Sequence, residues 1–71
     1  MQGKIRVVND KMYGFIRGED NKDYFFHKND YRDDWHEMDS DFKLEVPVKV
    51  VFEITMTPKG WRAVNVQRVI E

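Results

Sequence analysis

Five stretches of the chain alternate apolar with polar residues or concentrate β-branched and aromatic side chains, as β-strands do. They cover residues 3–9, 13–17, 23–27, 46–54 and 61–69. Glycine, proline, asparagine and aspartate interrupt the pattern at 18–22 and 55–60, which predicts a hairpin loop and a turn. Pro47 is expected at the start or on an edge of the fourth strand, because it has no N–H for a ladder hydrogen bond.

The period of the pattern changes between the third and fourth strands. Apolar side chains recur there at i, i+4, i+7 and i+11, the spacing of one helix face: Tyr31, Trp35, Met38 and Phe42. Asn29 or Asp30 is expected to cap this helix, and Asp33 and Asp34 fall in an early turn, where the helix dipole favours anions. The pattern therefore predicts a short helix with an acidic outer face.

The order of the elements is three strands, a helix and two strands. This order is typical of an all-β, five-stranded antiparallel OB-fold barrel with a short helix between strands 3 and 4, and a small SH3-like barrel is the alternative. A chain of 71 residues has room for a single domain, 1–71. The apolar helix face is expected to close one end of the barrel, while a position of Trp35 over a binding face is the alternative.

The second and third strands are rich in rings. Alternation puts Ile16, Tyr24 and Phe26 on one face, which we expect to fill the barrel. The other face, named here the aromatic face, carries four rings: Tyr13, Phe15, Phe25 and His27. An exposed patch of this kind usually marks a binding site, and nucleobases stack on such rings. In the reverse register these rings would be core, and the polar neighbours would be buried with them.

Charge is unevenly distributed along the chain. The net charge is −1, from 12 basic and 13 acidic residues. Residues 29–41 sum to −5 and the rest of the chain to +4, so a mildly basic body carries one acidic segment. That segment is expected to be a solvated helix face, and the alternative is that it repels nucleic acid and so orients a bound strand.

Several function classes find no support in the sequence. There is no cysteine, no apolar run of membrane-spanning length and no signal-peptide pattern, so we expect a cytoplasmic protein without membrane contact. The two histidines are nine residues apart without a recognised ligand spacing, so no metal or other cofactor is expected. No nucleophile–base pair and no glycine-rich phosphate loop is present, so no enzyme activity is expected.

Two motifs give the sequence a family resemblance. KMYGFI at 11–16 resembles the first nucleic-acid motif of cold-shock domains, K-G-[FY]-G-F-I, and DYFFH at 23–27 resembles the second, D-V-F-V-H. GKIRVVN at 3–9 is similar to the opening strand of the family, and VVFEI at 50–54 and GWRAVNV at 60–66 to its last two strands. The chain thus looks like a divergent cold-shock domain over nearly its whole length. The resemblance implies an OB barrel that binds single-stranded RNA and DNA by base stacking and acts as an RNA chaperone.

The resemblance also implies roles for individual residues. The four rings of the aromatic face match the stacking positions, and Arg6 and Lys11 match positions where the family has basic residues near phosphates. The sequence departs from the family at Val7, which replaces an exposed tryptophan, and at Met12, which replaces a glycine. Lys28 replaces an aromatic residue after the second motif and exchanges stacking for charge.

Basic residues also flank an aromatic one at the start of the fifth strand. Lys59 and Arg62 lie on either side of Trp61, which stands where the family has proline or a small residue. Basic and aromatic residues interleaved in this way suit contacts with phosphates and bases. We therefore count Lys28, Lys59 and Arg62 as phosphate contacts, while stacking and simple packing both remain open for Trp61.

Two functions of different classes follow. The first is single-stranded nucleic-acid binding by a monomer, with roles as an RNA chaperone or a regulator of transcription or translation. The second is a protein-interaction adaptor that buries the same aromatic face against a protein partner, because aromatic residues are also favoured at protein interfaces. Salt dependence distinguishes them, since counterion release makes nucleic-acid affinity fall steeply with salt.

Overall fold

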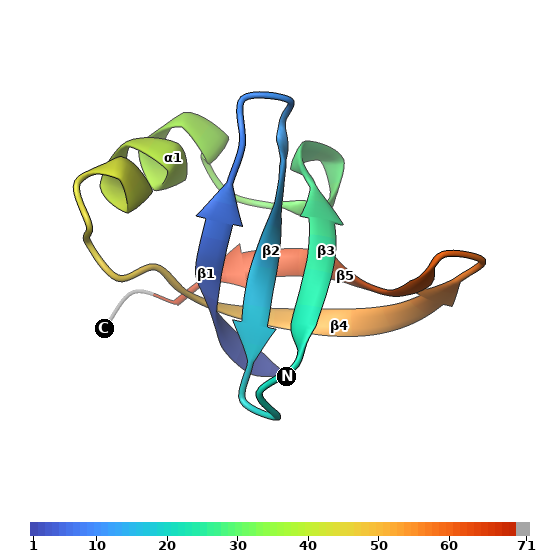
Figure 1. Cartoon of the computed structure of the whole chain (residues 1–71). Coiled ribbons are helices and arrows are strands. Elements are labelled where there is room, and N and C mark those ends of the chain that lie inside the picture. The colour runs from blue at the N-terminus through green and yellow to red at the C-terminus, as the bar shows by residue number, and fades with distance from the viewer. Residues whose placement is uncertain (70–71) are drawn as a thin grey trace.

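The computed structural model describes residues 1–69, and its five strands wrap into one closed barrel (Figure 1). The strands are β1 (Gln2–Val8), β2 (Tyr13–Gly18), β3 (Asp23–His27), β4 (Lys49–Thr57) and β5 (Gly60–Arg68). They follow one another around the barrel in the order β1-β2-β3-β5-β4. Together with a short helix between β3 and β4, this architecture confirms the predicted OB-fold.

One strand pair differs from the purely antiparallel barrel expected from the sequence. β3 and β5 run parallel where Phe25 lies opposite Arg62, and all other neighbouring strands run antiparallel. The reason is topological. Directions cannot alternate all the way around a closed ring with an odd number of strands, so at least one neighbouring pair must be parallel.

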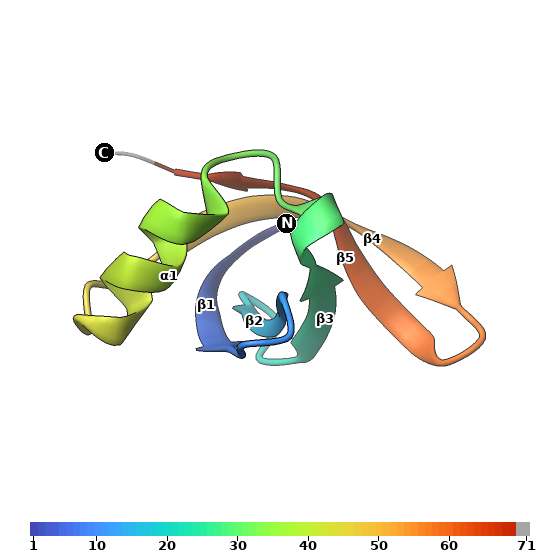
Figure 2. The same ribbon diagram turned by 90° about the horizontal axis from the view of Figure 1, so that it is seen from above.

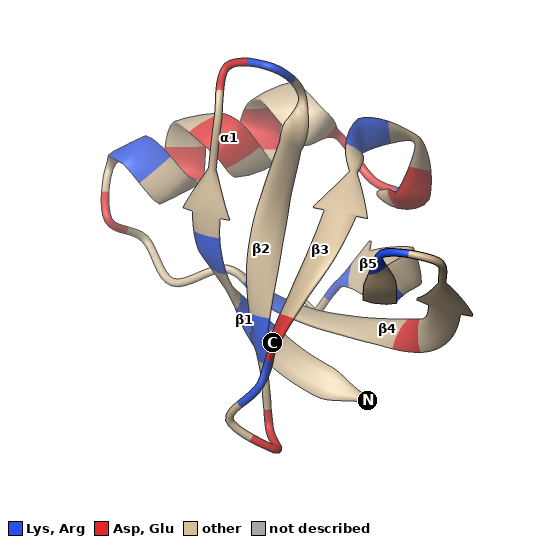
Figure 3. Ribbon diagram, turned by 45° about the vertical axis from the view of Figure 1, so that its right-hand side comes forward, with Lys and Arg blue, Asp and Glu red and all other residues tan. Residues whose placement is uncertain are grey.

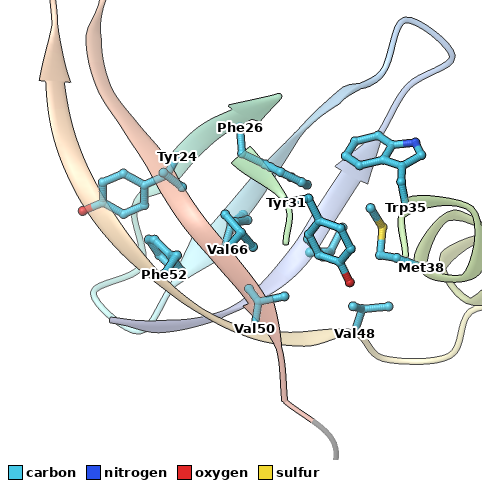
Figure 4. Packing of buried hydrophobic residues seen from close by; sticks show 12 residues of the cluster. Tyr24, Phe26, Tyr31, Trp35, Met38, Val48, Val50, Phe52 and Val66 are labelled. Atoms are coloured by element: carbon cyan, nitrogen blue, oxygen red, sulfur yellow. The ribbon is translucent and has the colours of Figure 1, made fainter. Parts of the chain in front are cut away.

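The interior of the barrel is apolar and continuous (Figure 4). It contains every side chain that alternation assigned to it from β2 and β3, and Val48, Val50 and Phe52 from the fourth strand region. Among the described residues, the buried hydrophobic side chains are Ile5, Ile16, Tyr24, Phe26, Tyr31, Trp35, Met38, Val48, Val50, Phe52, Ala63 and Val66. The predicted register of the β2–β3 hairpin is therefore confirmed, and the reverse register is excluded.

The helix is shorter than the apolar spacing predicted. α1 spans Trp35–Lys43, and its cap is Asp34, whose Oδ1 accepts a hydrogen bond from the Glu37 N–H at 3.2 Å. The expected cap at Asn29 or Asp30 is wrong, because residues Lys28–Asp30 form the separate 3₁₀ turn η1.

The stretch between η1 and α1 is extended because it pairs with β5. Tyr31 bridges Val66, and the Arg32 N–H donates to the Val66 carbonyl at 2.8 Å. Asp33 accepts from the Arg68 N–H at 2.6 Å, so it is not in a helical turn. Trp35 and Met38 are buried over the open end of the barrel, which confirms that the helix closes it.

The β4–β5 hairpin is longer than expected. β4 begins at Lys49 rather than at residue 46, and pairing with β5 continues to Thr57 opposite Gly60. The turn predicted over 55–60 therefore shrinks to Pro58 and Lys59, followed by Gly60 at φ 119°. The hairpin projects past the edge of β3 (Figures 1 and 2). No helix within residues 1–69 is long and apolar enough to cross a membrane.

Candidate nucleic-acid interface

The β2–β3 hairpin brings the four rings of the aromatic face together. Tyr13 lies opposite His27, and Phe15 lies opposite Phe25. The ring centroids of Tyr13 and Phe25 are 5.3 Å apart, and those of Phe15 and Phe25 are 5.9 Å apart in an edge-on arrangement. Phe15 is 37% exposed, and the other three are half-buried. The predicted patch thus exists as one connected surface on the outer side of the barrel.

The His27 ring is held at the start of η1. Its Nδ1 accepts a hydrogen bond from the Asn29 N–H at 3.2 Å, and the His27 N–H donates to Asp30 Oδ2 at 3.0 Å. Because Nδ1 is the acceptor, the neutral ring carries its proton on Nε2. This reciprocal capping fixes the position of the ring and leaves Nε2–H as its donor.

Arg62 joins the aromatic face from the neighbouring strand. It lies opposite Phe25 in the β3–β5 register, and its Nη2 donates to Asp30 Oδ2 at 2.6 Å. The Asp30 side chain is only 11% exposed, so this ion pair is shielded from solvent. Arg62 Nε is buried without a hydrogen-bond partner among the described residues. Asp30 therefore holds both Arg62 and His27 at one edge of the rings.

A second carboxylate, Asp23, lies at the other end of the aromatic face, opposite Arg17 in the β2–β3 register. Asp23 accepts from Arg17 Nε at 2.6 Å and from Arg6 Nη1 at 2.5 Å. The hydrogen bond from Arg17, together with the charges of Arg17 and Arg6, holds the pKa of Asp23 below its usual value. Asp23 is therefore ionised at neutral pH, and Arg6, predicted near phosphates, already has an acidic partner.

The three predicted lysines lie around the rings on loops and turns. Lys11 is in the β1–β2 loop, Lys28 opens η1 directly after His27, and Lys59 is at the tip of the β4–β5 hairpin. All three are exposed, and none of them forms an ion pair with a described residue. They are the predicted basic residues with unengaged charge.

Trp61 lies on a different face of its hairpin from Arg62. It is opposite Met56, and the next pair on the same side is Ile54 and Ala63, of which Ala63 is buried. Because the hairpin extends beyond the barrel, Trp61 remains 56% exposed and Met56 67% exposed. Trp61 is thus an exposed ring rather than a core residue, separated from the aromatic face by strand alternation.

The first strand and the loop that follows it contain two departures from the family pattern. A β-bulge between Ile5 and Val7 lets both Arg6 and Val7 point outward, with Val7 opposite Phe15 and 43% exposed. Val7 therefore continues the aromatic row with an aliphatic side chain. Met12 adopts φ 68° in the following loop, a conformation that a glycine adopts without steric cost.

Sequence reasoning missed the two carboxylates that organise the site. Asp23 is directly opposite Arg17, so the hairpin register already contained that signal. Asp30 and Arg62 are separated by 32 residues, and no local pattern connects them. The acidic segment is also partly engaged, because Arg68 contacts Asp41 at 2.7 Å and Glu37 at 3.7 Å.

Comparison with known families agrees with this architecture. The chain matches the model of the 'cold-shock' DNA-binding domain over residues 1–69. A comparison with curated proteins finds no match. Because the family model covers nearly the whole chain, the motif resemblance at 11–16 and 23–27 is confirmed. The chain belongs to the cold-shock domain family, a family of nucleic-acid-binding domains.

Proposed function

We propose that the protein binds single-stranded RNA or DNA by stacking bases on the aromatic face. The observation that carries this proposal is the set of four rings on the outside of β2 and β3. Phe25 contacts Tyr13 and Phe15 at centroid distances of 5.3 and 5.9 Å, and His27 lies opposite Tyr13. Stacking on such rings contributes about 1–3 kcal/mol per base and depends little on base identity. We therefore expect modest sequence preference and a role as an RNA chaperone or as a regulator of transcription or translation.

Charges around the rings support a phosphate-bearing ligand. Lys11, Lys28 and Lys59 are exposed and form no ion pair with a described residue, while Arg62 is held beside Phe25. Paired strands present few free base faces, because their bases already stack on each other. A duplex of the same sequence is accordingly expected to bind weakly.

The first experiment is a titration of labelled oligo-dT and oligo-U, each about seven nucleotides long, within the site size of an OB-fold. Phe15→Ala and Phe25→Ala should each weaken binding by about 5- to 150-fold, corresponding to one lost stacking contact. Fluorescence anisotropy at low and moderate salt measures both the affinity and its salt slope. Leu44→Ala is the matched control, because Leu44 is 72% exposed and lies at the end of α1, away from the rings.

A protein-interaction adaptor is the second candidate. It is favoured by the net charge of −1 and by the engagement of Arg6 and Arg62 with Asp23 and Asp30, which leaves less free positive charge for phosphates. Folded wild-type protein that fails to bind either oligonucleotide at low salt would contradict the first candidate and favour the second. Binding that is tight but independent of both Phe15 and Phe25 would contradict stacking on this face.

A further inference from the structure

The outer surface of the barrel carries a row of basic residues beside the aromatic face. Lys4 on β1 lies opposite Arg17 on β2 and opposite Lys49 on β4, so the three side chains share one face of neighbouring strands. Like charges directly opposite each other destabilise a sheet. Arg17 offsets this repulsion through its ion pair with Asp23, whereas Lys4 forms no ion pair with a described residue. Lys4 is therefore the member of the row whose charge an anion would stabilise.

A hollow of about 730 Å³ lies over this basic row. Its charged lining residues are Lys4, Arg6, Arg17, Lys49 and Glu19, four basic residues against one acidic residue. None of the residues that line it is aromatic. Figure 3 shows the basic segments of β1 and β2 side by side at the same end of the sheet. The hollow therefore offers charge but no ring on which a base could stack.

The basic row continues the aromatic face. Arg17 is two residues beyond Phe15 on β2, and side chains two residues apart share a face about 7 Å apart along a strand. On β1, the row that contains Phe15 ends in Val7, which has no ring. A strand that leaves Phe15 in this direction thus passes from a stacking surface to a charged surface.

We propose that the basic row is a second contact for the same nucleic-acid strand and binds the phosphodiester groups of nucleotides that continue past the aromatic face. This inference rests on the proposed function. Lys4 is its central residue, because it lies in the middle of the row and forms no ion pair with a described residue. The contact recognises backbone phosphates and is indifferent to the bases.

An oligonucleotide with an abasic tail tests this inference. The core is an oligo-dT of about six nucleotides, within the OB-fold site size. It is compared with the same core extended, at the 5′ or the 3′ end, by an equal length of abasic sugar–phosphate. The abasic tail at one end should raise affinity and steepen the salt slope by about 0.7 for each phosphate contacted.

Two variants identify the residues responsible. Lys4→Gln should lower the salt slope of the tailed oligonucleotide by about 0.7 and leave the untailed core unchanged. Lys43→Gln is the charge-matched control, because Lys43 lies on α1 and pairs with Asp39 instead of lining the hollow. The control should bind both oligonucleotides like the wild type, and circular dichroism confirms that each variant is folded.

Three outcomes would overturn the inference while the proposed function stands. In the first, the abasic tail adds no affinity at either end. In the second, only a tail that carries bases adds affinity. In the third, Lys4→Gln and Lys4→Gln/Arg17→Gln both keep the full gain in affinity from the abasic tail. Failure of the proposed function looks different, because the untailed core then does not bind or binds equally well after Phe15→Ala.

Discussion

Tyr31 shows how a single buried residue can conflict with its surroundings. Its ring packs at the closed end of the barrel, 6.3 Å from Phe26 and 6.0 Å from Trp35 between centroids. Its hydroxyl oxygen is buried and has no hydrogen-bond partner among the described residues. A buried polar group without a partner costs about 1–3 kcal/mol. The residue therefore contributes packing through its ring and a penalty through its hydroxyl.

Replacing Tyr31 by Phe should consequently stabilise the protein at neutral pH. Tyr31→Phe keeps the ring and removes the unpartnered hydroxyl, so we expect the free energy of unfolding to rise by about 1 kcal/mol at pH 7. Urea unfolding followed by circular dichroism measures the difference. Tyr13→Phe is the control, because Tyr13 is half-buried on the outer face and its hydroxyl is not among the buried unpartnered groups. A variant less stable than wild type would show that the hydroxyl is satisfied in solution.

The same residue predicts an alkaline limit of stability. Burial, with a further contribution from the charge of Asp33, raises the pKa of Tyr31 to about 12. In the unfolded chain a tyrosine ionises near pH 10, so the unfolded state loses its proton first. This ionisation leaves the free energy of unfolding unchanged below pH 10 and lowers it between pH 10 and 12, by up to about 2.7 kcal/mol. Urea unfolding at several pH values should show a loss in wild type that exceeds that of Tyr31→Phe, and equal losses would contradict the pKa.

The orientation of single side chains was predictable from the sequence on some strands but not on the first. The inward positions of Ile16 and Phe26 followed from alternation, because nothing interrupts β2 and β3. Alternation predicted no register for the first strand, where a bulge between Ile5 and Val7 turns two successive side chains outward. A bulge adds one residue to one strand only, and it is visible only against its partner strand.

At the scale of the element, α1 depends on its cap. Asp34 supplies the side-chain acceptor for the Glu37 N–H, and the helix has only nine residues, too short to be stable alone. Asp34→Ala should lower the free energy of unfolding by about 1 kcal/mol. Oligonucleotide affinity should stay unchanged, because α1 packs on the core at the end of the barrel, whereas the aromatic face lies on the outside of β2 and β3. Urea unfolding and anisotropy on the same samples measure both quantities.

The control for this prediction is Asp34→Asn, which retains a capping oxygen and should lose much less stability than Asp34→Ala. Equal losses of stability for the two variants would show that the cap is not the cause of the loss.

The sequence pattern predicted the apolar face of α1 but not the residue at which the helix begins. The competing partners are on β5, where the Val66 carbonyl accepts from the Arg32 N–H and the Arg68 N–H donates to Asp33. Partners so distant in the sequence leave no local signal.

At the scale of the whole molecule, net charge is a poor guide to the surface. The chain sums to −1, yet the surroundings of the aromatic face and the hollow beside it are mostly basic. Part of the acidic charge is engaged with arginines, through Asp23, Asp30 and Asp41. The topology of the barrel was predictable from element order, but the pairing of charges across 17 to 32 residues required the folded chain.

Ligand binding should therefore be visible in the stability of the whole barrel. A ligand that binds only the folded state stabilises it by about 2.7 kcal/mol at a hundredfold excess over Kd. The unfolded chain has a net charge of −1, so it is expected to have little affinity for a polyanion. For a domain of this size the gain corresponds to a rise in Tm on the order of 10 °C. Differential scanning fluorimetry with oligo-dT should show this rise, and a matched duplex should produce much less.

Phe15→Ala separates binding from general stabilisation in this experiment. Phe15 is outside the buried core, so the variant should melt near the wild type without ligand yet lose most of the rise with oligo-dT. A rise of equal size in wild type and variant would mean that the oligonucleotide acts elsewhere on the surface. No rise in wild type, at concentrations that saturate anisotropy binding, would mean that the folded and unfolded chains bind equally. Selective binding by the folded aromatic face would then be contradicted.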